Sequence, residues 1–154
     1  MNRHSDFLII GGGIIGLSLA QLLGKTAQVT LIEKDYLGAH ASTHNSAVIH
    51  GGIYYPNGSL KSKYWVRGNK LLTDFWKEHA IRINNLGKII APRENSEIPQ
   101  LEELYAKAVR NGAEVKIIDY HEAKEIEPRI VEKEKYIWSP RTSVADNLAV
   151  IKTL

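Results

Sequence analysis

The sequence contains no cysteine among its 154 residues. Without cysteine the chain can form neither a disulfide framework nor a thiolate metal site, and no thiol can act as a nucleophile. An excess of charge of one sign is also lacking, because 20 basic residues oppose 17 acidic ones and leave a net charge of +3. So small an excess, spread over the whole chain, argues against nucleic acid as a partner.

Long apolar runs are missing as well. The most apolar stretch, residues 7–23, is broken by four glycines, and no stretch reaches the roughly 18 apolar residues that a membrane span needs. Asp6 interrupts the passage from the basic N-terminus into this stretch, which argues against a signal peptide. The sequence therefore predicts a cytoplasmic protein without a membrane span, and it leaves peripheral contact with a membrane open.

The N-terminal residues carry the pattern of a βαβ unit. Residues 6–10 are a short run of strand-favouring apolar residues that ends in three glycines, which is typical of a strand buried on both faces of a parallel sheet. Residues 14–23 predict a helix that ends at Gly24, and residues 27–32 predict a second strand. We therefore predict a βαβ unit over residues 5–34.

The remaining residues predict an irregular loop followed by further α/β elements. Residues 35–58 form the loop, and residues 59–154 contain the further segments. Ser59 predicts the N-cap of a helix of about 20 residues. One stripe of that helix is expected to be core, and it consists of Leu60, Tyr64, Leu71, Leu72, Phe75, Trp76 and His79.

Three more elements and a last helix follow in the pattern. Residues 87–91 and 115–118 predict strands. Between them, Ser96 predicts the N-cap of a helix that ends at residues 111–112. Asp146 predicts the N-cap of a last helix, for whose apolar face the sequence shows no partner element. The predicted fold class is α/β.

Three glycines, Gly11, Gly13 and Gly16, satisfy the pattern G-x-G-x-x-G between the first strand and the first helix. In such a turn a helix N-terminus and close backbone approach favour binding of a pyrophosphate. Glu33 stands at the end of the second strand, where a carboxylate hydrogen-bonds the ribose hydroxyls of an adenosine and repels a 2′-phosphate. The pattern predicts a site for a dinucleotide other than NADP, with a purely structural glycine turn as the alternative.

The loop after the second strand resembles a known family. Residues 37–55 read LGAHASTHNSAVIHGGIYY, and the resemblance continues through LGKII at 86–90, EAKEIEP at 122–128 and SPRT at 139–142. It is a resemblance to the FAD-dependent oxidoreductases of the D-amino-acid oxidase superfamily, and within them most to the L-2-hydroxyglutarate oxidases and dehydrogenases. It implies a Rossmann-like FAD-binding βαβ unit with additional α/β elements and FAD as the cofactor.

Two positions and the length depart from the family. Ala47 and Ser143 stand where the family has glycine, and we expect Ala47 to restrict a backbone meant to lie close to the flavin. The family is much longer than this chain, so the resemblance implies residues 1–154 to be its N-terminal part, truncated before the C-terminal portion of the family fold. We therefore expect these residues to be inactive alone and to associate with themselves or with a complementing C-terminal chain.

The resemblance also implies a set of site residues. Those implied to contact FAD are Gly11, Gly13, Ile14, Ile15, Gly16, Glu33, Lys34, Ser42, Asn45, Ser46, His50, Gly51 and Gly52. Ser42, Asn45 and Ser46 would meet the phosphates or ribitol, whereas His50, Gly51 and Gly52 would pass by the isoalloxazine.

The implied reaction is oxidation of a 2-hydroxy acid, above all L-2-hydroxyglutarate to 2-oxoglutarate. Hydride would pass to flavin N5, a base would take the hydroxyl proton, and oxygen or a quinone would reoxidise the flavin. We expect His50 to be the catalytic residue, since imidazole titrates near neutrality. A histidine that only hydrogen-bonds the loop is the alternative.

Other functions stay open at this point. One is a non-catalytic remnant or interaction module that has lost FAD, and another is a glycine- or sarcosine-type oxidase or a glycerol-3-phosphate dehydrogenase relative. Three histidines, His40, His44 and His50, fall close together, but on an irregular loop and without an H-E-x-x-H motif, so we predict no metal site. Lys61 and Arg67 are expected to be surface cations, with contact to a substrate carboxylate as the alternative.

Overall fold

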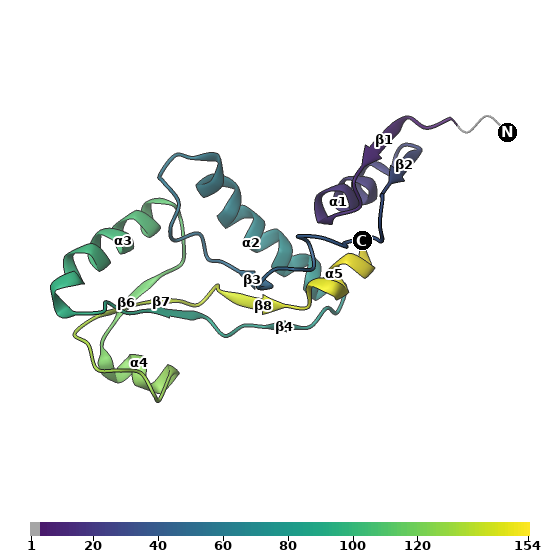
Figure 1. Ribbon diagram of the computed structural model, residues 1–154. Helices are drawn as coiled ribbons and strands as arrows, with labels where there is room; N and C mark the ends of the chain where they lie inside the picture. Colours follow the sequence, from purple (N-terminus) through teal and green to yellow (C-terminus); the bar gives the residue numbers. More distant parts are fainter. Residues whose placement is uncertain (1–3) are drawn as a thin grey trace. The chain divides into compact units, whose positions relative to one another are not determined.

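The computed structural model describes residues 4–154 (Figure 1). The chain divides into two compact units. Of the described residues, unit 1 comprises 4–47, 79–82 and 145–154, whereas unit 2 comprises 48–78 and 83–144.

Unit 1 is built on the predicted βαβ unit. Strand β1 (Phe7–Ile10) is followed by helix α1 (Ile14–Leu23) and strand β2 (Val29–Ile32), and the two strands pair in parallel. The expectation that the first strand is buried on both faces is wrong for the described chain. Leu8 is 58% exposed and Ile10 is 83% exposed, because β1 and β2 form a sheet of two strands only among residues 4–154.

The last helix of unit 1 has the predicted N-cap and an unexpected partner. Helix α5 (Asn147–Thr153) begins after Asp146, whose carboxylate accepts the Ala149 N–H at 2.9 Å. The expectation that its apolar face lacks a partner is wrong, because Ile151 is only 7% exposed and packs closely against Gly38. Asn147 of the same helix donates to the Thr43 carbonyl at 3.2 Å, so α5 contacts a loop that is distant in sequence and that no local pattern predicts.

Unit 2 contains two small sheets and three helices. One sheet has the order β3 (Val48–Ile49), β8 (Ser143–Ala145) and β4 (Ile83–Asn84), and the other has the order β5 (Lys88–Ile90), β7 (Tyr136–Ser139) and β6 (Lys116–Ile118). The helices are α2 (Leu60–Glu78), α3 (Ile98–Arg110) and α4 (Tyr120–Ile126). The pairings of β3 with β8, and of β5 and β6 with β7, are antiparallel.

The core of unit 2 lies along β7 and the adjoining helices. Tyr136 and Ile137 are fully buried, and Tyr136 packs with Ile118 and Ala123. In a second apolar cluster of unit 2, Ile53 packs with Ala108 of α3. Burial of apolar surface therefore fixes the segment that follows His50 against a helix and a sheet.

Helix α2 begins as predicted but buries another face. The Ser59 hydroxyl accepts the Ser62 N–H at 3.1 Å, as an N-cap does. The predicted core stripe is confirmed at Trp76, which is 3% exposed, but it is wrong at Leu60, Tyr64 and Leu71, which are all more than half exposed. The buried residues of the helix recur every seven positions, and they are Ser62, Asn69 and Trp76.

The start of α3 also differs from the prediction. Ser96 lies inside a short 3-10 helix (Asn95–Glu97), and α3 starts after Glu97 without a side-chain cap. Its predicted end is confirmed, with Asn111 as the C-cap and Gly112 in a left-handed conformation at φ +76°. Helix α4 was not predicted, although Asp119 and Glu122 form a capping box at its start.

Ala47 adopts φ +54°, a left-handed conformation that favours glycine. The residue that departs from the family thus occupies a strained backbone position in the loop. Replacing Ala47 with glycine should stabilise the chain by about 0.5–1 kcal/mol, because relief of the left-handed strain outweighs the extra freedom of glycine in the unfolded state. Thermal unfolding measures this change.

Ala41 provides the matched control for that prediction. It lies in the same loop, is exposed and has no positive φ. Ala41→Gly should lower the melting temperature, since only the unfolded state gains from it. Equal effects of the two substitutions would contradict the strain argument.

Candidate functional site

The turn between β1 and α1 is closed by a contact that only glycine permits. A Cβ atom on Gly16 would lie 1.9 Å from the carbonyl oxygen of Gly11, and Gly11 itself has φ +110°. The glycine roles expected for helix and strand approach are therefore present in the geometry. The contact holds the N-terminus of α1 at the carboxyl end of β1.

The N-terminus of α1 has backbone donors for an anion. The first N–H groups of a helix have no acceptor within the helix. The Ile14 N–H donates to the Ser42 hydroxyl at 3.0 Å, whereas the structure of residues 4–154 gives the N–H groups of Ile15 and Gly16 no acceptor. Gly13, the N-cap, has φ −78° and carries no side chain that could cover these donors.

Glu33 lies at this same turn. Its carboxylate accepts the Gly12 N–H at 2.6 Å and the Asp35 N–H at 3.0 Å. The hydrogen bonds from Asp35 and Gly12 lower the pKa of Glu33, since both favour the charged form. The carboxylate is thus held beside the glycines, and its contact with a ribose stays a prediction. Lys34 is exposed, with its Nζ 4.0 Å from Asp35.

The loop of residues 41–47 is held by Asn45. The Asn45 side chain donates to the carbonyls of Ala41 and Ser42 and accepts the Ala47 N–H at 2.7 Å. Asn45 therefore shapes the loop that presents Ser42 to the helix N-terminus. Ser46 is exposed.

His50, Gly51 and Gly52 belong to unit 2. The His50 carbonyl accepts hydrogen bonds from Trp65 Nε1 at 2.8 Å and Asn69 Nδ2 at 3.1 Å, so the backbone of this segment is fixed to α2. The imidazole Nδ1 is buried without a hydrogen-bond partner among the described residues. Burial, and then the nearby charge of Lys88, lower the pKa of His50 and favour the neutral ring.

The two glycines after His50 are required by close contacts. A Cβ on Gly51 would lie 2.7 Å from Ser139 Oγ, and Gly52 has φ +86°. Larger residues would push the chain away from its neighbours. The segment is therefore built for close backbone packing, and its approach to the isoalloxazine stays a prediction.

Three side chains near the glycine turn come within reach of one cation. Ligand atoms of Glu33, Asp35 and His40 all lie within 4.8 Å of one another. The His40 Nε2 is 2.8 Å from an Asp35 oxygen, and Glu33 already accepts two backbone N–H groups. Hydrogen bonding within the loop explains the cluster, so we assign no metal to it. His44 and His50 are not part of it.

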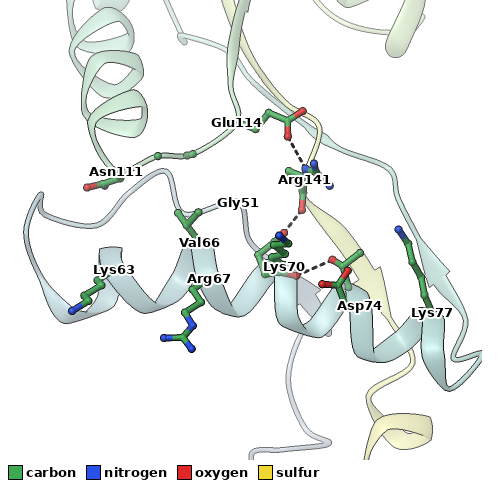
Figure 2. Close-up of a pocket in the computed structure, with 14 residues that line it drawn as sticks. Gly51, Lys63, Val66, Arg67, Lys70, Asp74, Lys77, Asn111, Glu114 and Arg141 are labelled. Atoms are coloured by element: carbon green, nitrogen blue, oxygen red, sulfur yellow. Dashed lines mark hydrogen bonds and ion pairs between the residues drawn. The ribbon is translucent and has the colours of Figure 1, made fainter.

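A basic groove of about 570 Å³ runs along α2 in unit 2 (Figure 2). Figure 2 shows Arg141 above the helix, paired with Glu114, and their closest atoms are 2.6 Å apart. Gly51 borders the groove, so positive charge lies near the His50 segment. The cations that line the groove are Lys63, Arg67, Lys70, Lys77 and Arg141. Lys61, by contrast, lies over the Tyr55 ring at 5.8 Å.

The residues 6–154 match the family model described as FAD dependent oxidoreductase. The chain therefore belongs to this family, and its parallel βαβ unit with the glycine turn fits a class of proteins that bind a dinucleotide. Its relatives include the mitochondrial L-2-hydroxyglutarate dehydrogenase of Caenorhabditis elegans, which is 42% identical over 92% of this chain. The L-2-hydroxyglutarate dehydrogenase of Escherichia coli K12 is 39% identical over 81% of the chain.

Two solved structures share the fold. The L-alpha-glycerophosphate oxidase of Mycoplasma pneumoniae, solved with FAD bound, is 28% identical, with a TM-score of 0.85 over 97% of this chain and 41% of that one. The L-proline dehydrogenase of P. horikoshii, at 22% identity and a TM-score of 0.82, shows the fold alone. The chain spans about a third of the length of the dehydrogenases. Within residues 4–154, no helix has the length and apolar character to cross a membrane.

Replacing Gly16 with alanine should lower the free energy of unfolding by about 2–3 kcal/mol, because the new Cβ would overlap the Gly11 carbonyl and separate strand from helix. Gly68→Ala is the matched control, since nothing lies within 4 Å of its Cβ position in α2 and alanine is the better helix residue by up to about 1 kcal/mol. Denaturant unfolding measures both. A tolerated Gly16→Ala would refute the close contact.

Acid should test the hydrogen bonds of Glu33. A carboxyl group whose pKa is lowered on folding stabilises the chain above its unfolded pKa, and this contribution is lost as pH falls through the folded pKa. Since the pKa of Glu33 lies below its ordinary value of 4.5, wild type should lose more stability on acidification below that pH than Glu33→Gln. Parallel stability curves for the two proteins would show that the carboxylate is not hydrogen-bonded.

Proposed function

We propose that the chain binds FAD and serves in the oxidation of a 2-hydroxy acid, with L-2-hydroxyglutarate as the substrate. The observation that carries the proposal is the glycine turn, where unpaired N–H groups of α1 and the Glu33 carboxylate lie together. Identity of 39–42% to L-2-hydroxyglutarate dehydrogenases supports the substrate. Because the chain spans a third of those relatives, the complete activity is proposed for a protein of their length.

The residues of unit 1 fit the adenosine and pyrophosphate parts of FAD. Ile15 and Gly16 supply backbone donors with partial positive charge for the pyrophosphate. The Ser42 hydroxyl accepts the Ile14 N–H, and both groups would hydrogen-bond the phosphates. The Glu33 carboxylate now accepts the Gly12 N–H and would accept a ribose hydroxyl in its place when FAD binds. The carboxylate would be charged in both arrangements.

The proposed chemistry in unit 2 centres on His50. When bound, FAD supplies the hydride acceptor, atom N5 of its ring. His50 would take the hydroxyl proton of the substrate, because its unpartnered Nδ1 is an available acceptor when the ring is neutral. The lowered pKa keeps the ring neutral at physiological pH. The electron acceptor that restores the oxidised flavin is proposed to be oxygen or a quinone.

A second candidate is oxidation of a glycerol phosphate. It is favoured by the similarity to the glycerophosphate oxidase at a TM-score of 0.85, but the 28% identity of that chain is lower than the identity of the dehydrogenases. Comparing turnover of the two substrates in a protein of full family length separates the candidates. The first proposal requires preference for L-2-hydroxyglutarate.

Replacing Gly13 with valine should abolish FAD binding while the fold persists. Valine is compatible with φ −78°. Its Cβ would lie 3.0 Å from Ser42 Oγ, and its methyl groups would occupy the path to the helix N-terminus. Titration of the purified chain with FAD, followed by flavin fluorescence, measures the affinity. Thermal unfolding confirms that the variant is folded.

Gly68→Ala serves as control and should bind FAD as wild type does. Wild-type protein that binds no FAD would contradict the proposal and favour a remnant that has lost the cofactor. FAD binding that survives Gly13→Val would place the flavin elsewhere.

A further inference from the structure

Lys88 lies beside the segment that carries His50. It begins strand β5 and pairs in register with Ser139 of β7. Its Nζ donates to the Tyr54 hydroxyl at 2.8 Å and lies 4.4 Å from the centre of that ring. No ion pair of Lys88 is found in residues 4–154. The structure of residues 4–154 therefore holds the ammonium group of a half-buried lysine against Tyr54 and gives it no anion.

A small cavity joins Lys88 to His50. It has a volume of about 60 Å³ and lies wholly within unit 2. Since a water molecule occupies about 30 Å³ in the liquid, the space suits one carboxylate group. The lining residues are His50, Gly51, Ile53, Tyr54, Tyr55 and Lys88.

The groups at this cavity have complementary roles. The ammonium of Lys88 and the hydroxyl of Tyr54 are donors, whereas the buried Nδ1 of His50 has no partner. In a 2-hydroxy acid the carboxylate is one bond from the carbon that bears the hydroxyl. A base for the hydroxyl and a cation for the carboxylate must therefore be close neighbours, as His50 and Lys88 are.

We propose that Lys88 and Tyr54 form a carboxylate-binding subsite next to His50 that selects 2-hydroxy acids over 2-amino acids. The subsite rests on the proposed function and assigns its substrate class. A carboxylate supplies the anion that Lys88 lacks, and charge-assisted hydrogen bonds of this kind are the strong ones. The 2-ammonium group of an amino acid would instead face the positive charge of Lys88, whereas a neutral hydroxyl can donate to His50.

The electrostatic surroundings support this selectivity. Lys61 lies 5.8 Å from the centre of the Tyr55 ring, and Tyr55 lines the cavity. Gly51 lines both this cavity and the basic groove. A positively charged ammonium group on the substrate is therefore disfavoured, and a dianion such as 2-hydroxyglutarate is attracted.

The test is a titration of the 154-residue chain, labelled at histidine, with L-2-hydroxyglutarate while the His50 imidazole resonances are recorded. Wild type should respond, and Lys88→Met should weaken the response about tenfold to a hundredfold, as expected for loss of a hydrogen bond to a charged group. Lys88→Arg should restore most of the affinity, and Tyr54→Phe should lose less than Lys88→Met. L-glutamate, the amino-acid probe, should bind wild type at least about tenfold more weakly than the hydroxy acid.

Lys116→Met is the matched control, because Lys116 is an exposed lysine on another strand of the same sheet. It should leave the titration unchanged. As a readout independent of ligand, Lys88→Met should raise the pKa of His50, since it removes the charge that helps to lower it. If Lys88→Met fails to fold, Lys88→Arg and Tyr54→Phe decide.

The inference is overturned if His50 does not respond to L-2-hydroxyglutarate, if the Lys88 and Tyr54 variants bind as wild type does, or if L-glutamate binds equally well. FAD titration of the same samples separates this failure from that of the proposed function. Wild type that binds FAD but fails the carboxylate test loses only the subsite. Wild type that binds no FAD, yet shows a Lys88-dependent response of His50, loses the flavin proposal and keeps the subsite.

Discussion

The close approach of Gly16 to the Gly11 carbonyl is the constraint on which the glycine turn depends. Any side chain at position 16 would separate helix α1 from strand β1, since its Cβ would lie 1.9 Å from that oxygen. The contact aims the N-terminus of the helix past the end of the strand, where Ser42 and Glu33 meet it. Backbone geometry, rather than a charged side chain, thus provides the positive end of the proposed pyrophosphate site.

A second backbone segment is fixed in a similar manner in unit 2. The His50 carbonyl is held by Trp65 and Asn69, and Asn69 also donates to the Arg141 carbonyl at 2.9 Å. Asn69 is buried, and its side-chain amide donates to both carbonyls. Buried polar groups are normally satisfied by hydrogen bonds of this kind. Helix α2 thereby fixes the backbone at His50 through Trp65 and Asn69.

The predictable part of the fold is the part with strong local signals. The βαβ unit, the Ser59 N-cap, the Asp146 N-cap and the end of α3 each have a residue pattern that specifies them, and the structure has them. Hydrophobic periodicity failed on α2, because its buried positions include Ser62 and Asn69, which are held by hydrogen bonds. The capping box of α4 was visible in the sequence, whereas the two-residue strand β4 has no local signal.

The candidate site also has a part that the sequence predicts and a part that it does not. The glycines and Glu33 follow a fingerprint with known spacing, so their grouping at one turn was predictable. Lys88, which donates to Tyr54, was not, because hydrogen bonds between residues distant in sequence leave no periodic trace. The bonds of Asp35 with Glu33 and His40 lie within one irregular loop, which has no periodic pattern either. Ala47 departs from the family pattern, since alanine takes a left-handed position where the family has glycine.

The central claim is that the N-terminus of α1 receives the pyrophosphate of FAD. Amide resonances of the uniformly ¹⁵N-labelled chain, recorded as FAD is added, test it most directly because every backbone N–H reports its own surroundings. The account predicts that the largest shifts fall on Gly12 through Gly16 and on Ser42. Saturable FAD binding that leaves these amides unchanged would contradict it.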